Sequence, residues 1–149
     1  MPRLLVFAIS EKCITSKDDD TNSLITLVTG LAINVRLGET VPEETVAPVN
    51  LAATALWLRL PEDEGKRFES KVELIAPNGE LNGVGTGTFE LLKKSATTKV
   101  LFPVFPVGLP GIYQMRLSFR EATETEWTLS SEYPLELEHR TVQMDQVAE

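Results

Sequence analysis

The sequence predicts an all-β protein, an antiparallel β-sandwich of about seven to nine strands, from three observations. Residues 111–120 alternate between apolar and polar side chains, which is the period of a strand with one buried face. Similar short segments recur along the chain, separated by polar turns at intervals of roughly 8–15 residues. No amphipathic segment of ordinary helix length interrupts the series.

The first third of the chain is expected to hold a strand, a turn, two short strands and a loop. Residues 3–9 are apolar on both faces and predict a strand that is covered on both sides. Residues 15–23 are polar and predict a turn. The β-branched residues of segment 24–36 favour strand over the alternative of a helix, and Gly30 indicates a bulge or a break within it. Residues 37–50, with their prolines and glutamates, predict a long loop.

The middle of the chain is expected to hold two strands joined by a solvated turn. Residues 51–60 predict the first strand, although their beginning also fits a helix, and residues 61–66 predict the turn. Residues 68–76 alternate and stop at the strong turn signal of residues 77–79, Pro-Asn-Gly. The side chains expected to point inward from the two strands are Leu56, Leu58, Leu60, Val72 and Leu74.

The last third of the chain continues this pattern. Residues 81–92 carry three alternating glycines and predict a strand. The two prolines of residues 98–107 remove hydrogen-bond donors, so this segment is expected to be an edge strand or an extended loop. After the alternating segment 111–120, a polar turn at residues 121–125 precedes a last strand at residues 127–137.

Length and composition indicate one domain and exclude several partner classes. The 149 residues are expected to form one domain over residues 1–138, with residues 139–149 as a polar tail. The net charge of −8, without a cluster of lysines and arginines, argues against nucleic acid and anionic membranes as partners. Cys13 is the only cysteine, which leaves no intrachain disulfide and favours a reducing compartment. The apolar run at residues 4–9 is shorter than the about 7–15 residues of a signal-peptide core, and no run nears the ~20 residues of a membrane helix, so we predict a cytoplasmic location.

Residues 109–115 resemble the tyrosine corner of immunoglobulin-like domains. The family pattern is Asp-x-Gly-x-Tyr-x-Cys, and this chain has Leu109-Pro-Gly111-Ile-Tyr113-Gln-Met115. The glycine and the tyrosine match, whereas Leu109 and Met115 depart from the pattern and exclude the version with a disulfide. The resemblance implies that the Tyr113 hydroxyl bonds back to upstream backbone at a Greek-key corner. A plain hairpin strand is the alternative.

Four segments together resemble a family of small bacterial immunoglobulin-like β-sandwich proteins of unknown function. The segments are residues 3–35, 66–79, 111–113 and 133–137. The resemblance covers most of the chain and lies in its pattern rather than in a diagnostic motif. It implies an immunoglobulin-like sandwich of Greek-key type in a bacterial cytoplasm, and it brings no catalytic residues.

The sharpest charged cluster is the run of Asp18, Asp19 and Asp20, which is the candidate for a calcium site. Calcium prefers carboxylates that converge from one or more loops, and Asp63 or Glu64 from another loop would complete such a set. The EF-hand spacing is absent, and adjacent aspartates of an extended chain point in different directions. A solvated turn is therefore the preferred interpretation, and no metal ligand is assigned.

The residues that catalysis needs are sparse. His139 is the only histidine and lies in the expected tail, where no partner is expected to orient it. The alternating glycines, Gly83, Gly85 and Gly87, fit neither a dinucleotide fingerprint nor a P-loop, and instead clear one strand face for a neighbouring backbone or a ligand. We therefore expect no enzyme and no cofactor. The alternative from another class is a small hydrolase or sugar-binding enzyme that uses paired carboxylates.

The segment 102–111 is the expected contact surface, because prolines break a run of apolar residues that a strand would otherwise bury. The same prolines also blunt a sheet edge, so the segment supports two interpretations. The candidate contact residues are Phe102, Val104, Phe105, Val107 and Leu109. We predict a non-enzymatic binding or protein-interaction module with a protein partner or self-association, in which the loops at residues 15–23 and 61–67 are further candidate surfaces. The alternatives are a structural subunit of a phage or secretion assembly and a small carbohydrate-active or calcium-binding protein.

Overall fold

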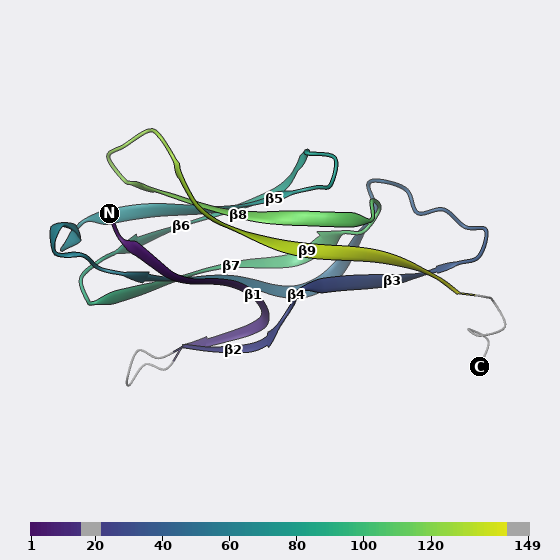
Figure 1. The fold of residues 1–149 in the computed structure, drawn as a ribbon, viewed down its shortest axis with the longest axis horizontal. Helices are drawn as coiled ribbons and strands as arrows, with labels where there is room; N and C mark the ends of the chain where they lie inside the picture. Colours follow the sequence, from purple (N-terminus) through teal and green to yellow (C-terminus); the bar gives the residue numbers. More distant parts are fainter. Residues whose placement is uncertain (16–21, 143–149) are drawn as a thin grey trace.

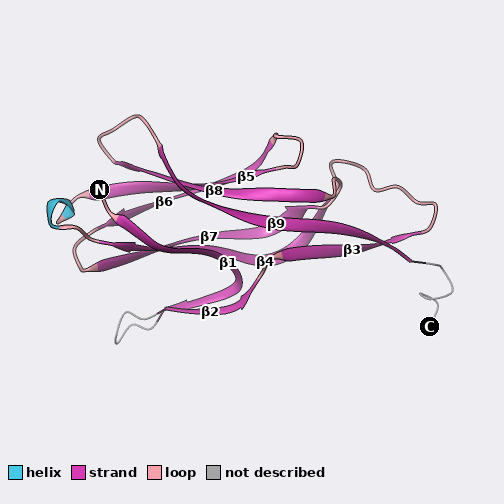
Figure 2. Ribbon diagram, viewed as in Figure 1, coloured by secondary structure: helices cyan, strands magenta, loops and turns pink. Residues whose placement is uncertain are grey.

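The computed structural model describes residues 1–15 and 22–142, and in them nine strands form two sheets that pack face to face (Figure 1). The four-stranded sheet has the order β2-β1-β4-β7, and the five-stranded sheet has the order β3-β9-β8-β5-β6. The strands are β1 (Arg3–Thr15), β2 (Asn22–Leu27), β3 (Gly30–Arg36), β4 (Val46–Leu58), β5 (Arg67–Ile75), β6 (Leu81–Glu90), β7 (Ser95–Pro106), β8 (Gly111–Glu121) and β9 (Thr128–Val142). The one helical element of the described residues is a single 3₁₀ turn, Pro61–Asp63, so the expected all-β class is confirmed (Figure 2).

One strand pair departs from the antiparallel pattern. β3 runs parallel to β9, whereas the other paired strands of the described residues are antiparallel. The reason is that β2 and β3, although consecutive, belong to different sheets, and the chain crosses between the sheets at residues 28–29. The Val28 N–H donates to the Ile9 carbonyl at 2.9 Å, and the Tyr133 hydroxyl donates to the Val28 carbonyl at 2.8 Å. The break expected near Gly30 is therefore a change of sheet.

The inward faces of β5 and β8 are the expected ones. The buried side chains on these faces include Val72 and Leu74 of β5 and Tyr113, Met115, Leu117 and Phe119 of β8. The Tyr113 hydroxyl donates to the Leu109 carbonyl at 2.6 Å, so the bond to upstream backbone that the tyrosine corner implies is present. Met115, the residue that departs from the cysteine of the pattern, is fully buried in the core.

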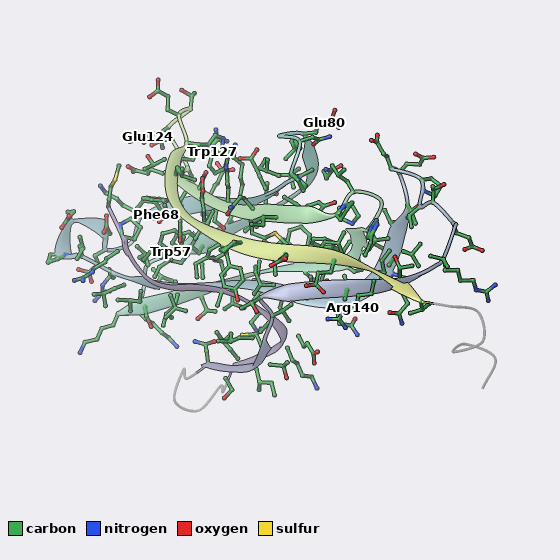
Figure 3. All side chains as sticks on the ribbon, turned by 45° about the vertical axis from the view of Figure 1, so that its right-hand side comes forward. Trp57, Phe68, Glu80, Glu124, Trp127 and Arg140 are labelled. Carbon is green, nitrogen blue, oxygen red and sulfur yellow. The ribbon has the colours of Figure 1, made fainter. Side chains whose placement is uncertain are left out.

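Trp57 lies in the core and is fully buried (Figure 3). Its ring stacks on that of Phe89, with centroids 5.2 Å apart, and lies 5.1 Å from the ring of Phe119. Its indole N–H donates to the Thr98 hydroxyl at 3.2 Å. Because Trp57 points inward, the odd-numbered residues of β4 face the core. The prediction that the inward side chains are Leu56, Leu58 and Leu60 is wrong, and these three are only partly buried.

The covering of β1 and two element boundaries also differ from expectation. β1 is not covered on both sides along its first half, where Leu5 and Val6 are 45% and 42% exposed. The loop after β3 is shorter than expected, because β4 begins at Val46. β9 continues to Val142 alongside β3, so residues 139–142 are strand rather than tail.

The end of β1 and β2 form a hairpin on the outer side of the four-stranded sheet (Figure 1). Two hydrogen bonds hold this hairpin to β7. Asn22 Nδ2 donates to Thr97 Oγ1 at 2.9 Å, and Lys99 Nζ donates to the Cys13 carbonyl at 3.4 Å. On the face that points away from the core, the four-stranded sheet has small buried side chains, which leave room for the hairpin. These are Ala8, Ser10, Ala52 and Thr54.

Candidate functional site

Two strand edges meet along one side of the sandwich. β6 ends the five-stranded sheet and β7 ends the four-stranded sheet, so within the described residues each has one edge without a strand partner. A hollow of about 410 Å³ lies between them, which we name the edge groove. Its lining consists of Glu43, Glu44, Val46, Leu74, residues 82–85, residues 100–104 and Pro106.

The alternating glycines of β6 shape the edge groove. They pair with Leu74, Val72 and Ser70 of β5 and share the inward face of the sheet with them. At Gly85 the two edges touch, since a β-carbon there would lie 2.1 Å from Cγ1 of Val100. At Gly83 the nearest atoms to a β-carbon, on Leu74 and Phe102, would lie at 3.8 and 3.9 Å. The groove is therefore closed at Gly85 and opens from Gly83 toward the start of β6.

The rim of the edge groove is apolar and exposed. Leu101 of β7 is 73% exposed, Val84 of β6 is 56% exposed, and Val46 of β4 is 57% exposed. The floor is made by the buried side chains of Leu74 and Phe102. Exposed apolar side chains that cluster around a hollow are typical of a surface that contacts a partner.

This rim differs from the contact surface expected from the sequence. Phe102, Phe105 and Val107 are buried in the core, so their assignment to an exposed surface is wrong. Leu109 is half-buried, and Val104 is the expected contact residue that is exposed. Val104 is exposed although Phe102 is buried, because the pairing of β4 with β7 shifts register between Pro48 and Leu51 of β4. The inward side chains of β7 are even-numbered up to Phe102 and odd-numbered from Phe105 onward.

The rim also includes residues that the sequence did not indicate. Leu101, Val84 and Val46 were not among the expected contact residues, although Leu101 stands between two apolar neighbours on the opposite face of β7. Strict alternation applied from Thr98 onward would have placed Leu101 outside. Val46 and Val84 carry no such signal, because they join the rim through pairing between distant segments.

The charged part of the edge groove is the turn at residues 42–45, which we name the acidic turn. Glu43 and Glu44 are the only charged residues among the described residues of the lining, and within the described part of the chain neither forms an ion pair. The Val107 N–H donates to the Thr45 carbonyl at 2.8 Å, which fixes the turn to the segment after β7. A β-carbon at Gly108 would lie 2.2 Å from the Pro42 carbonyl oxygen, so the turn packs directly on that glycine.

His139 supports the same segment from β9. Its Nε2 lies 2.6 Å from the Val107 carbonyl oxygen and donates to it. The sequence placed His139 in a tail without an orienting partner, and this expectation is wrong. The histidine holds backbone rather than a reacting group, so its position gives it a structural role.

The two edges beside the groove differ in their capacity to accept another strand. β7 contains Pro103 and Pro106, which lack N–H donors, and prolines of this kind block pairing along a sheet edge. The start of β6, residues 81–85, has no proline and keeps every backbone donor and acceptor. Of the two alternatives expected for segment 98–107, the edge strand is the one observed, since β7 extends to Pro106, but β6 is the edge that is open to pairing.

A second hollow, of about 990 Å³, lies where the chain crosses between the sheets. Glu11, Lys12 and Asn50 line it, and each is exposed. Thr26 on its lining has a φ of 58°, a left-handed conformation that β-branched residues rarely adopt. Since every polar side chain that lines this hollow is exposed, it offers a ligand no desolvated polar group to fix its orientation.

A third cluster lies on the outer face of the five-stranded sheet. The centroid of the ring of Trp127, a residue labelled in Figure 3, lies 4.6 Å from Lys71 Nζ and 4.2 Å from Arg120 Cζ. Arg120 also pairs with Glu69 at 3.5 Å. The cations are thus already partnered, and the cluster fastens the loop between β8 and β9 to the sheet.

The candidate calcium ligands fall partly outside the described structure. Asp18, Asp19 and Asp20 lie outside the described residues. Asp63 is 1% exposed rather than part of a solvated turn, and its carboxylate accepts from the Leu60 N–H at 3.3 Å and pairs with the Met1 amino group at 3.0 Å. Among the described residues, no group of three or more histidine, cysteine, aspartate and glutamate side chains has a geometry that would hold a metal ion.

No protein-family model matches the chain, and a search of curated proteins finds no significant match to it. In residues 1–15 and 22–142, no helix has the length and the apolar character to cross a membrane.

Proposed function

We propose that the chain is a non-enzymatic binding module that docks an extended polypeptide segment in the edge groove. The segment would pair with the free edge of β6 and extend the five-stranded sheet by one strand. The observation that carries this proposal is an apolar, exposed groove beside a sheet edge without prolines. Main-chain hydrogen bonds supply affinity in this mode of recognition, and the groove supplies specificity.

The proposal includes an immunoglobulin-like, Greek-key assignment of the fold. In that sandwich, strands B and E share one sheet, and strands C, F and G share the other. The pairing of β4 with β7, and of β5 with β8 and β8 with β9, supports the same arrangement. The corner bond of Tyr113 at the start of β8, the strand equivalent to F, supports it further. A bacterial cytoplasm is the proposed setting, on the resemblance of the sequence and its single cysteine.

The experiment is selection of random peptides displayed on phage against the full chain and against Gly83→Leu. Leucine at residue 83 fills the edge groove, and Gly83→Ala is the matched control because its β-carbon fits at ordinary contact distance. We expect selected peptides to bind the wild-type chain and Gly83→Ala, and to bind Gly83→Leu at least tenfold more weakly. Hydrogen exchange with a selected peptide should slow at residues 81–85. Peptides that bind Gly83→Leu equally well, or that protect another strand, would overturn the proposal.

A further inference from the structure

We infer that the segment that docks in the edge groove is a basic and apolar strand. It carries apolar side chains at alternate positions and a lysine or arginine where it passes Glu43 and Glu44. This inference rests on the proposed function and names the chemistry of the partner.

The shape of the groove selects alternating apolar side chains. A strand added to β6 places every second side chain between the sheets. Next to Gly83 that side chain meets the floor of Leu74 and Phe102, which a β-carbon at residue 83 would contact at 3.8 and 3.9 Å. At a rise of about 3.3 Å per residue, the stretch 81–85 accommodates about two inward side chains before contact with Val100 closes the groove at Gly85.

The charges of the groove select a positive group at its acidic end. Glu43 and Glu44 are exposed, and no lysine or arginine among the described residues lines the groove with them. Their position is fixed, because the acidic turn is bonded to Val107 and packed on Gly108. The net charge of −8 adds to the attraction for a basic partner and repels an acidic one.

A second copy of this chain is a poor occupant. If β6 of another copy were added, one of its faces would present Gly83, Gly85 and Gly87, which have no side chains to fill the groove. Its other face presents Asn82, Val84 and Thr86, of which one is apolar. β7 of another copy would bring Pro103 and Pro106, which remove donors. A different polypeptide therefore fits the groove better than self-association does.

The test uses three labelled synthetic peptides and the full chain. The first peptide alternates valine with threonine and ends in two lysines. The second is identical except that it ends in two glutamates. The third has the composition of the first, with its valines grouped together. Fluorescence anisotropy measures binding at about 0.01 M and about 0.15 M salt, where the screening lengths are about 30 Å and about 8 Å.

We expect the alternating lysine peptide to bind at least tenfold more tightly than its glutamate twin and than the grouped peptide at low salt. The double variant Glu43→Gln, Glu44→Gln should reduce the preference for lysine to less than about threefold. Glu39→Gln is the matched control, because Glu39 lies in the same loop but outside the lining, and it should preserve the preference. Gly83→Leu should abolish binding of the lysine peptide.

The outcomes separate this inference from the proposed function. Equal binding of the lysine and glutamate peptides, with both lost in Gly83→Leu, contradicts the basic partner and leaves the groove as a docking site. A control Glu39→Gln that acts like the double variant contradicts it as well, because net charge alone would then explain the preference. Absence of peptide binding up to millimolar concentration, or binding that survives Gly83→Leu, contradicts both.

Discussion

The backbone of Gly85 on β6 packs directly against the side chain of Val100 on β7, so that a β-carbon at residue 85 would lie 2.1 Å from Val100 Cγ1. This contact joins the free edges of the two sheets. The edge groove lies beside it, and Gly83 is part of its lining. The missing side chain at Gly85 thus allows the two edges to touch, and the missing side chain at Gly83 shapes the groove beside that contact.

Gly85→Ala should destabilise the fold by about 1–3 kcal/mol, because the added methyl group forces Val100 or the strand to move. Gly87→Ala is the matched control on the same face of the same strand. Its β-carbon would have Ser70 Oγ as nearest atom at 3.7 Å, so alanine there should be neutral or stabilise by up to about 1 kcal/mol. Urea unfolding of the two variants measures the difference. Equal stabilities would show that β7 does not press on Gly85.

Thr98→Val should destabilise the fold by about 1–3 kcal/mol. It leaves the indole N–H of Trp57 buried without its hydrogen-bond acceptor. Thr54→Val is the control, since the Thr54 hydroxyl is also buried but has no hydrogen-bond partner among the described residues. That change should be neutral or stabilising. Chemical denaturation followed by tryptophan fluorescence compares the two, and the account of the core fails if Thr54→Val is the more harmful variant.

Both tyrosines should resist ionisation in the folded protein. Burial raises the pKa of Tyr113 and of Tyr133 above the usual value of about 10, and the bond that each hydroxyl donates to backbone is lost with its proton. Because the folded state holds these protons more tightly, their contribution to stability is complete below pH ~10 and is lost as the pH rises through the raised pKa values. Tyrosinate absorbance should therefore appear together with unfolding. A titration near pH 10 without loss of structure would contradict this.

Gly108→Ala should displace the acidic turn. The new β-carbon would lie 2.2 Å from the Pro42 carbonyl oxygen and 2.3 Å from that of Glu43, and backbone cannot yield as a side-chain end can. We expect a loss of about 1–3 kcal/mol in stability and faster hydrogen exchange of the Val107 amide, whose bond to Thr45 depends on the turn. Unchanged exchange at Val107 would mean that the turn is held by other contacts.

Alternation predicted the strands that have one buried and one solvated face. β5 and β8 are of this kind, so Val72 and Leu74 were placed correctly, and the apolar face of β8 is the buried one. β4 misled the same reasoning, because Ala52 and Thr54 outside the core are buried as well as Ala53 and Ala55 in it. Because both faces of β4 are shielded from water here, the pattern of small and apolar residues does not specify which face of the strand packs on the core.

The edge groove was only partly predictable. The proline content of residues 98–107 indicated an edge strand, and the glycines of β6 indicated a cleared face. Which residue occupies the space over these glycines, and where the groove opens, depends on the contact between Val100 of one sheet and Gly85 of the other. The register shift between Pro48 and Leu51 decides which side chains of β7 are exposed. Neither relationship is contained in any single segment.

The central claim is that the free edge of β6 accepts a strand in the edge groove. Its most direct test is hydrogen exchange of the full chain with and without the alternating valine and threonine peptide that ends in two lysines. Slower exchange at residues 81–85 in the wild-type chain, absent in Gly83→Leu, is the predicted result. Binding of the peptide without slower exchange there, or the same protection in Gly83→Leu, would contradict the claim.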